Sequence, residues 1–207
     1  MKKIIVLLAV LPILLAVNIF AANKESKMEN MESSGRAVFA GGCFWCMESP
    51  FEKLDGVSEV LSGYTGGKKL NPTYKEVSAG GTGHTEAVEV HYNPMQISYE
   101  ELLEVFWQQI DPTDAGGQFV DRGDQYRSGI YYLDDEQKLL AEASKQSLAA
   151  SGRFNKPIVT EIVMAGKFYS AEEYHQDYHS KNPLRYKYYR YGSGRDKFLD
   201  QVWGKDR

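Results

Sequence analysis

Both cysteines of the chain lie in one short stretch, Gly41 to Glu48, and this stretch constrains the fold around it. It follows the apolar segment 37–40, which we expect to form a strand, and we expect a helix from about Met47 to Leu54. Pro50 limits how early that helix can be regular, because proline is tolerated only in a first helical turn. The sequence therefore predicts Cys43 and Cys46 in the turn between a strand and a helix.

This position favours reactivity at Cys43. The first turn of a helix leaves backbone N–H groups unpaired and carries partial positive charge, which stabilises a thiolate. Because a free cysteine titrates at about 8.5, we expect Cys43 to be nucleophilic near neutral pH. Two residues separate Cys43 from Cys46, so the pair can close a local disulfide, and Cys46 can resolve an oxidised Cys43.

Composition narrows the class of protein. The 207 residues, of which 43% are hydrophobic, suit one domain with a core of ordinary size. The formal charge is -4 and no segment forms a basic field, so we expect no nucleic-acid partner.

The N-terminus differs from the rest of the chain. Lys2 and Lys3 precede an almost unbroken apolar run from residue 4 to 20, followed by Ala21 and Ala22, which is the layout of a secretory signal peptide. An uncleaved membrane anchor is the alternative, because the run approaches the roughly 20 residues that span a bilayer. We expect residues 1–22 to direct export, residues 23–35 to form a polar tether and residues 36–207 to form the functional domain.

Further along the chain, strands and helices mix without strict alternation. Strands are expected at 57–62, 86–92, 128–133 and 157–164, from apolar or alternating patterns bounded by turn residues. Helices are expected after the Ser98–Glu101 capping box, from Asp134 to near Gly152, and from Ser170 to about Lys181. Residues 111–127 form a long polar connection of the kind that carries function, and 185–203 are expected to wrap the core. The pattern predicts one α+β domain with a mainly antiparallel sheet.

Four motifs occur in an order that points to a known family. They are the cysteine stretch 41–48, the loop 71–74, the segment 83–88 and the segment 121–128. Taken together they resemble the A-type peptide methionine sulfoxide reductases, which are specific for the S epimer, and the similarity runs from about residue 38 to 203. The resemblance implies a ferredoxin-like two-layer α/β sandwich that reduces methionine S-sulfoxide, free and in proteins.

The resemblance also assigns roles by position. Cys43 matches the nucleophile, Glu86 the acid that protonates the sulfoxide oxygen, and Asp121 a supporting polar residue. Phe44 and Trp45 match an apolar wall for the sulfoxide methyl group, and Tyr74 and Tyr126 match phenols that hydrogen-bond the oxygen. Many family members have glycine where Cys46 stands and carry resolving cysteines near the C-terminus, where this sequence has none. Recycling must therefore use Cys46 or an external thiol, and we expect Cys46 to resolve Cys43.

These residue types suit the chemistry. A sulfoxide sulfur is a poor electrophile until its oxygen is protonated or strongly hydrogen-bonded, so a neutral carboxylic acid and two phenols are useful. Attack by Cys43 leaves a sulfenic acid, which Cys46 converts to a disulfide. We expect a thioredoxin-like protein to reduce that disulfide, and we expect no bound cofactor or metal and a monomeric enzyme.

Other interpretations of the same residues exist. The cysteine pair alone fits an exported thiol-disulfide oxidoreductase, a structural disulfide, or half of a zinc site completed by His175 and His179 in a metal-binding or interaction domain. We favour a surface or packing role for both histidines. Taken alone, Glu86 would face solvent and Tyr74 and Tyr126 would pack, while His84 orders its loop or lies on the surface. Packing is also expected for Tyr186, Tyr188, Tyr189 and Tyr191.

Overall fold

The computed structural model describes residues 34–205, so the expected signal peptide and most of the tether lie outside the described residues. A six-stranded sheet has the order β7-β6-β1-β3-β2-β8. Only β6 and β7 pair in parallel; the other neighbours are antiparallel, as predicted. The strands are β1 (Gly35–Gly41), β2 (Val57–Thr65), β3 (Thr85–Tyr92), β6 (Ser128–Tyr132), β7 (Glu161–Met164) and β8 (Tyr169–Ser170).

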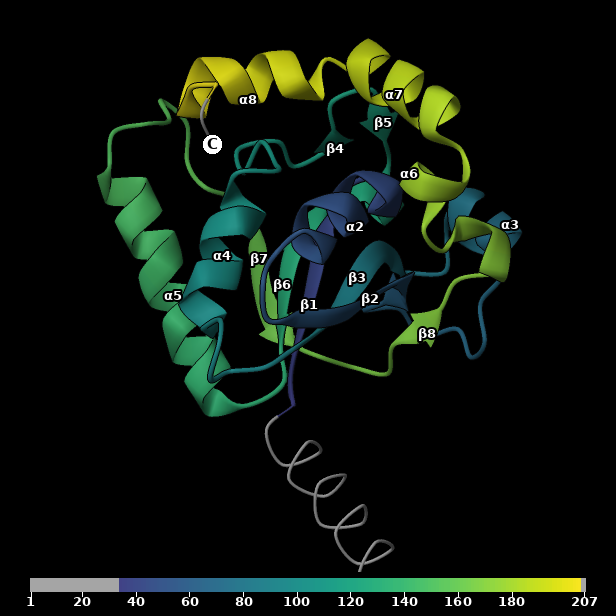
Figure 1. Cartoon of the computed structure of the whole chain (residues 1–207), viewed down its shortest axis with the longest axis horizontal. Helices are drawn as coiled ribbons and strands as arrows, with labels where there is room; N and C mark the ends of the chain where they lie inside the picture. The colour runs from purple at the N-terminus through teal and green to yellow at the C-terminus, as the bar shows by residue number, and fades with distance from the viewer. Residues whose placement is uncertain (1–33, 206–207) are drawn as a thin grey trace, which may run out of the picture. The chain divides into compact units, whose positions relative to one another are not determined.

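Helices cover the sheet and one of its ends. Figure 1 shows α7 and α8 crossing above the end of the sheet near α2, with α4 and α5 beside each other. The helices are α2 (Phe44–Glu52), α3 (Tyr74–Ser78), α4 (Tyr99–Trp107), α5 (Asp135–Ala150), α6 (Tyr178–Lys181), α7 (Pro183–Gly192) and α8 (Arg195–Trp203). The connection 111–127 contains the small strands β4 (Gly117–Gln118) and β5 (Asp121–Arg122) and the 3₁₀ turn η1 (Asp124–Tyr126).

The core lies between the sheet and α2, α4 and α5. The Phe39 ring of β1 stacks on Phe51 of α2 at 5.3 Å and on Phe106 of α4 at 5.1 Å between ring centroids. The alternate residues Val38 and Ala40 belong to a second cluster with Tyr131. Successive side chains of β1 therefore point to opposite faces of the sheet, and helices cover one of these faces. The two-layer α+β sandwich is confirmed.

The helix after the cysteines begins earlier than predicted. It starts at Phe44 with Cys43 as its N-cap, and Pro50 lies inside it. Proline has no N–H, so the carbonyl of Cys46, four residues earlier, loses its partner within the helix. Arg190 of α7 donates to that carbonyl at 3.1 Å instead. A tertiary contact thus replaces the missing bond, which the local sequence could not reveal.

The helix predicted from Ser170 to Lys181 is wrong. That segment contains β8, the 3₁₀ turn η2 (Glu173–His175) and the short α6. Asp177 has a left-handed backbone (φ 52°) that interrupts any continuous helix. The polar side chains bond other strands and loops: Glu172 accepts from the N–H of Tyr74, and Gln176 accepts from the N–H of Ser62.

The capping box at Ser98 and the helix that begins after Asp134 follow the prediction. Ser98 accepts from the N–H of Glu101 at 3.2 Å, and the Glu101 carboxylate accepts from the N–H of Ser98 at 2.8 Å. The Asp134 side chain caps α5 by accepting from the N–H of Gln137 at 2.8 Å. Within residues 34–205, no helix combines the length and the apolar character needed to cross a bilayer.

Candidate active site

Gly42 turns the chain from β1 into α2 and so places Cys43 at the helix N-terminus. Its φ of 83° lies in the left-handed region, which glycine adopts without strain. A Cβ at this position would come within 2.6 Å of the Gln118 Cβ, so the close approach of the 111–127 connection also requires glycine. The strand-to-helix turn is therefore confirmed as the position of Cys43, whereas the same prediction is wrong for Cys46, which lies inside α2 because the helix already begins at Phe44.

Cys43 and Cys46 are both free and buried, and Cys43 is 6% exposed. A hydrogen bond from the Cys43 thiol, helped by the charges of Arg195 and Arg190, lowers the pKa of Cys46 to about 6 against the effect of burial. Burial raises the pKa of Cys43, as do Cys46, Glu86 and Asp121. The pair therefore holds a proton on Cys43, and the expectation that the helix N-terminus lowers the pKa of Cys43 is wrong, because burial and nearby acids outweigh it.

Glu86 lies on β3, directly against the N-terminus of α2. Its carboxylate accepts from the Phe44 N–H at 3.1 Å, which is one of the N–H groups that the helix itself leaves unpaired. The residue is 2% exposed, so the solvent-facing position typical of an isolated strand glutamate does not apply. Burial raises the pKa of Glu86 to about 8, despite that hydrogen bond, and the acid is mostly neutral at pH 7.

Tyr74 lies in α3 and Tyr126 in η1, and both side chains are near Glu86 and Cys43. Burial raises the pKa of both phenols, and the charge of Glu86 raises each of them further. Cys43 also contributes to the shift of both, so the two phenols share the electrostatic surroundings of the thiol. Both hydroxyls stay protonated at neutral pH and can donate hydrogen bonds.

Asp121 connects the active site to α7 through a residue that sequence reasoning missed. The Tyr189 hydroxyl donates to the Asp121 carboxylate at 2.5 Å, and the Tyr189 ring meets Trp45 edge-on at 5.9 Å. Burial raises the pKa of Asp121, although the Tyr189 bond and Arg195 oppose the shift. Tyr189 stands among several tyrosines of one helix, so only its contact with Asp121 distinguishes it.

Two residues of the segment after β8 contact the Trp45 side chain. Its indole stacks on Tyr178 at 3.7 Å with 5° between the planes, and its Nε1–H donates to His175 Nδ1 at 3.1 Å. The centroid of the His175 ring also lies 4.9 Å from that of the Phe44 ring and 4.4 Å from that of the Tyr74 ring. The packing role favoured for His175 is thus confirmed. His175 and Tyr178 hold in place Phe44 and Trp45, the two residues of the expected apolar wall, which we call the aromatic wall.

Burial lowers the pKa of His175, so this ring is neutral near pH 7. Since Nδ1 accepts from Trp45, the ring proton must be on Nε2. That atom is buried and has no hydrogen-bond partner among the described residues. A hydrogen-bond donor next to Phe44 and Tyr74 is therefore free.

Two arginines from the C-terminal helices reach the base of the cysteine stretch. Arg195 is 1% exposed; it donates to the Gly41 carbonyl at 3.0 Å and to the carbonyl of Gln109. Arg190 bonds the Cys46 carbonyl and the Gln109 side chain. These contacts explain why both arginines lower the pKa of Cys46.

The structure confirms some of the remaining expectations, which concern His84 and the tyrosines of α7, and contradicts others. His84 is 1% exposed and orders its loop, because Nδ1 accepts from the Gly67 N–H and Nε2 lies 2.8 Å from the Lys69 carbonyl. Packing is confirmed for Tyr186, which is buried. It is wrong for Tyr188 and Tyr191, which are 83% and 85% exposed, because they lie on the solvent side of α7.

Comparisons with known proteins agree with this geometry. The family described as "Peptide methionine sulfoxide reductase" matches residues 35–207. Peptide methionine sulfoxide reductase MsrA of Bacillus licheniformis is 59% identical over 169 residues, covering 82% of this chain and 93% of that protein. Among solved structures, reduced Mxr1 of Saccharomyces cerevisiae aligns with a TM-score of 0.70 at 33% identity, over 73% of this chain and 87% of that one. Mxr1 in complex with Trx2 aligns at a TM-score of 0.52 and 25% identity, over 71% and 86%.

Proposed function

Because the chain belongs to the peptide methionine sulfoxide reductase family, we propose that it reduces methionine S-sulfoxide, free and in proteins, to methionine. The observation that carries the proposal is a buried carboxyl group, Glu86, held neutral at the N-terminus of the helix that begins after Cys43. Such an acid can protonate a sulfoxide oxygen next to a thiol. Disulfide exchange alone would leave this acid without a task.

We assign the steps as follows. The sulfoxide methyl group lies against Phe44 and Trp45, and its oxygen accepts from Tyr74 and Tyr126. As Cys43 attacks the sulfur, the Cys43 proton passes to Cys46, to which it is already hydrogen-bonded. Glu86 gives its proton to the oxygen. The bond between Cys43 Sγ and the substrate sulfur then breaks together with the S–O bond, and the hydroxyl group passes to Cys43 Sγ. Methionine leaves with the remaining electron pair, and Cys43 is left as a sulfenic acid.

Cys46 then completes the oxidation. Its thiol attacks the Cys43 sulfenic acid, which forms the disulfide and releases water. Two electrons from an external dithiol must restore the two thiols, and no bound cofactor takes part. Mxr1 has been seen in complex with Trx2, and we assign a thioredoxin-like reductant to this chain on that basis.

A single-turnover assay tests the proposal. Fully reduced protein is mixed with methionine S-sulfoxide without a reductant, and released methionine and lost thiols are counted. We expect about one methionine per chain with both thiols consumed. Cys43→Ser should release none, whereas Cys46→Ser should release one and then stall with a thioredoxin-like reductant. Intact thiols and no methionine in the unaltered protein would overturn the proposal.

We also propose that the protein works outside the cytoplasm, because residues 1–22 have the layout of a signal peptide. An oxidising compartment would then require a membrane-fed thioredoxin-like relay. N-terminal sequencing of the protein recovered from fractionated cells tests this. A start near residue 23 in the exported fraction supports cleavage, an intact N-terminus in the membrane fraction supports an anchor, and recovery from the cytoplasm contradicts export.

A further inference from the structure

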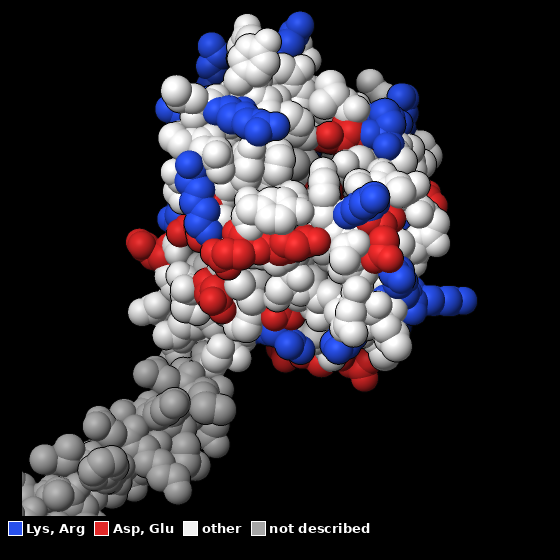
Figure 2. Space-filling model, turned by 90° about the vertical axis from the view of Figure 1, so that its right-hand side faces the viewer, with Lys and Arg blue, Asp and Glu red and all other residues white. Residues whose placement is uncertain are grey.

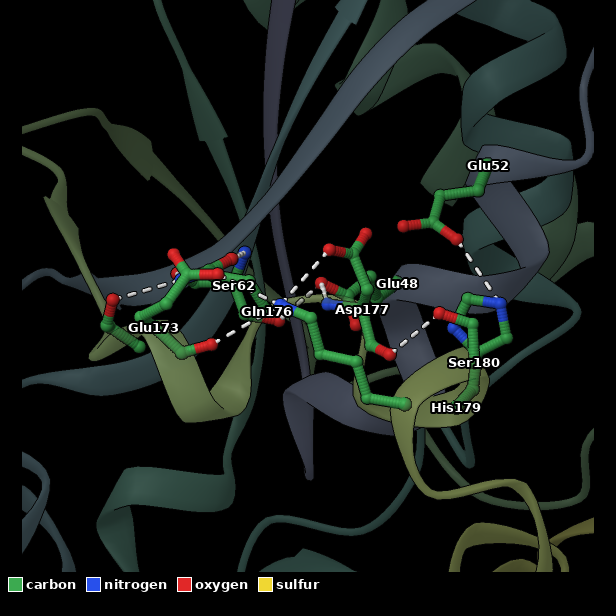
Figure 3. Close-up of polar contacts among 10 residues, drawn as sticks. Glu48, Glu52, Ser62, Glu173, Gln176, Asp177, His179 and Ser180 are labelled. Atoms are coloured by element: carbon green, nitrogen blue, oxygen red, sulfur yellow. Dashed lines mark hydrogen bonds and ion pairs between the residues drawn. The ribbon is translucent and has the colours of Figure 1, made fainter.

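Three side chains with metal-ligating atoms gather at the C-terminal half of α2, away from its cysteine end. Glu48 and Glu52 are four residues apart and therefore share a face of the helix. His179 of α6 lies opposite them, with Nε2 at 3.3 Å from a Glu52 oxygen. One ligand atom from each of the three residues lies within 4.8 Å of the others. Figure 3 shows the Glu52 carboxyl group joined to the His179 imidazole, with Glu48 nearby beside Asp177.

Two atoms of this group lack the partners that buried polar atoms normally have. Glu48 is fully buried; its Oε1 accepts from the Asp177 N–H at 3.0 Å and from Ser62 Oγ at 3.2 Å. Glu48 Oε2 and His179 Nδ1 are both buried and have no hydrogen-bond partner among the described residues. A buried acceptor without a partner costs free energy, so Glu48 Oε2 calls for a ligand. His179 would bind an ion through Nε2, the atom that faces Glu52, and would carry its proton on Nδ1.

The charge around the site also favours a cation. A pocket of about 390 Å³ adjoins the site, and its lining includes Glu52 and Glu59. Glu173 and Asp177 also line it, but both pair with Lys181, at 2.9 and 3.3 Å. Figure 2 views the side of the molecule that carries α3, α6 and β8, and acidic side chains gather across the middle of this face.

We propose that Glu48, Glu52 and His179 bind a first-row divalent metal ion that links α2 to α6. One imidazole nitrogen and two carboxylate oxygens, with water in the remaining positions, form a donor set that suits Zn²⁺. Two ligands about 2.0–2.1 Å from a tetrahedral ion lie about 3.3 Å apart, which matches the separation of His179 and Glu52. Zn²⁺ should bind more tightly than Mn²⁺ at such a site.

The site would act on the aromatic wall through α6. Tyr178, which stacks on Trp45, is the residue next to His179. The same segment reaches α2 through the Asp177 N–H bond to Glu48. A bound ion therefore stabilises the segment that holds Trp45, and its expected readout is stability rather than chemistry.

Titration of the full-length protein with Zn²⁺ and Mn²⁺ tests this inference. The background is Cys43→Ser with Cys46→Ser, which removes the two thiols as competing zinc ligands. Calorimetry should show one Zn²⁺ per chain, and the ion should raise the thermal unfolding midpoint. His179→Gln and Glu52→Gln should each weaken binding by roughly tenfold or more, since even loss of an outer partner costs about 10–100-fold.

A matched control is available in the sheet. His91 Nε2 lies 3.0 Å from a Glu89 oxygen, a histidine–carboxylate pair similar to that of His179 and Glu52. His91→Gln should leave Zn²⁺ affinity and the thermal shift unchanged. Equal Zn²⁺ binding in Glu52→Gln and in the parent would overturn the proposal, as would the absence of one-to-one binding. The assay does not depend on reductase activity, so its outcome is separate from that of the proposed function.

Discussion

Two features of Glu86 have opposite effects on its pKa: the side chain is buried, and it accepts a hydrogen bond from a helix N-terminus. The N–H of Phe44 favours the carboxylate, whereas burial favours the acid, and burial has the larger effect. The result is a proton donor with a pKa of about 8 rather than a fixed negative charge.

Glu86→Gln should remove the proton but keep the acceptor for the Phe44 N–H. We expect the single-turnover rate of methionine formation to fall by about 10²–10⁴-fold, the usual contribution of a positioned acid, with little loss of stability. In the unaltered protein that rate should fall as the pH rises through about 8, where Glu86 ionises. Rapid-quench assays from pH 6 to 9 measure both effects; a rate within tenfold of the parent, with the same pH profile, would contradict the assignment.

His175 and Trp45 should be energetically coupled. His175→Phe keeps a ring but leaves the N–H of the half-buried Trp45 without its acceptor, which costs about 1 kcal/mol of unfolding free energy. In a Trp45→Phe background that N–H is absent, so the same substitution should cost less. Urea unfolding of the four proteins gives the coupling energy, and equal costs in both backgrounds would show that the bond contributes nothing.

At this scale the sequence predicted which residues meet better than it predicted their surroundings. The roles of Cys43, Glu86, Tyr74 and Tyr126 stay predictions that rest on the resemblance, and the fold brings these residues together. Burial of Glu86 and of Cys43, and the effects of Glu86 and Asp121 on the Cys43 pKa, depend on contacts distant in sequence, which no local pattern contains. For the same reason Tyr189 was not separated from the other tyrosines of its helix.

At the scale of the element, α2 depends on a partner helix. Pro50 removes the N–H that would bond the Cys46 carbonyl, and Arg190 takes its place. The strand and helix limits that rest on local signals, such as the capping box at Ser98, were predicted within a few residues. The start of α2 and the broken segment at Asp177 were not, because tertiary hydrogen bonds decide both.

This dependence predicts an interaction between Pro50 and Arg190. Arg190→Met should lower the unfolding free energy by about 1.5–3 kcal/mol, because a buried carbonyl loses a charged donor. Pro50→Ala supplies an N–H for the Cys46 carbonyl, so the cost of Arg190→Met should be smaller in that background. Denaturant unfolding of the double-mutant cycle measures this, with Arg185→Met, which alters an exposed arginine, as the control. Strictly additive costs would mean that Arg190 does not replace the helical bond.

At the scale of the whole molecule, two buried acids link folding to pH. Burial raises the pKa of Glu48 to about 7 and that of Glu86 to about 8 in the folded state, whereas an unfolded glutamate titrates near about 4.3. The folded protein therefore holds protons that the unfolded chain has already lost. Their stabilising contribution is complete below pH about 4.3 and is lost as the pH rises through 7 and 8.

We therefore expect the free energy of unfolding to decrease between pH 5 and pH 9 when a chelator keeps divalent metals away. Glu48→Gln retains the acceptor for Ser62 and the Asp177 N–H but has no proton to lose, so its decrease should be smaller. Glu59→Gln, which alters an exposed residue of β2, should follow the parent. Since a divalent ion favours the ionised Glu48, added Zn²⁺ should offset the decrease in the parent but not in Glu48→Gln. A stability that stays level from pH 5 to 9 in chelator would contradict this account of both acids.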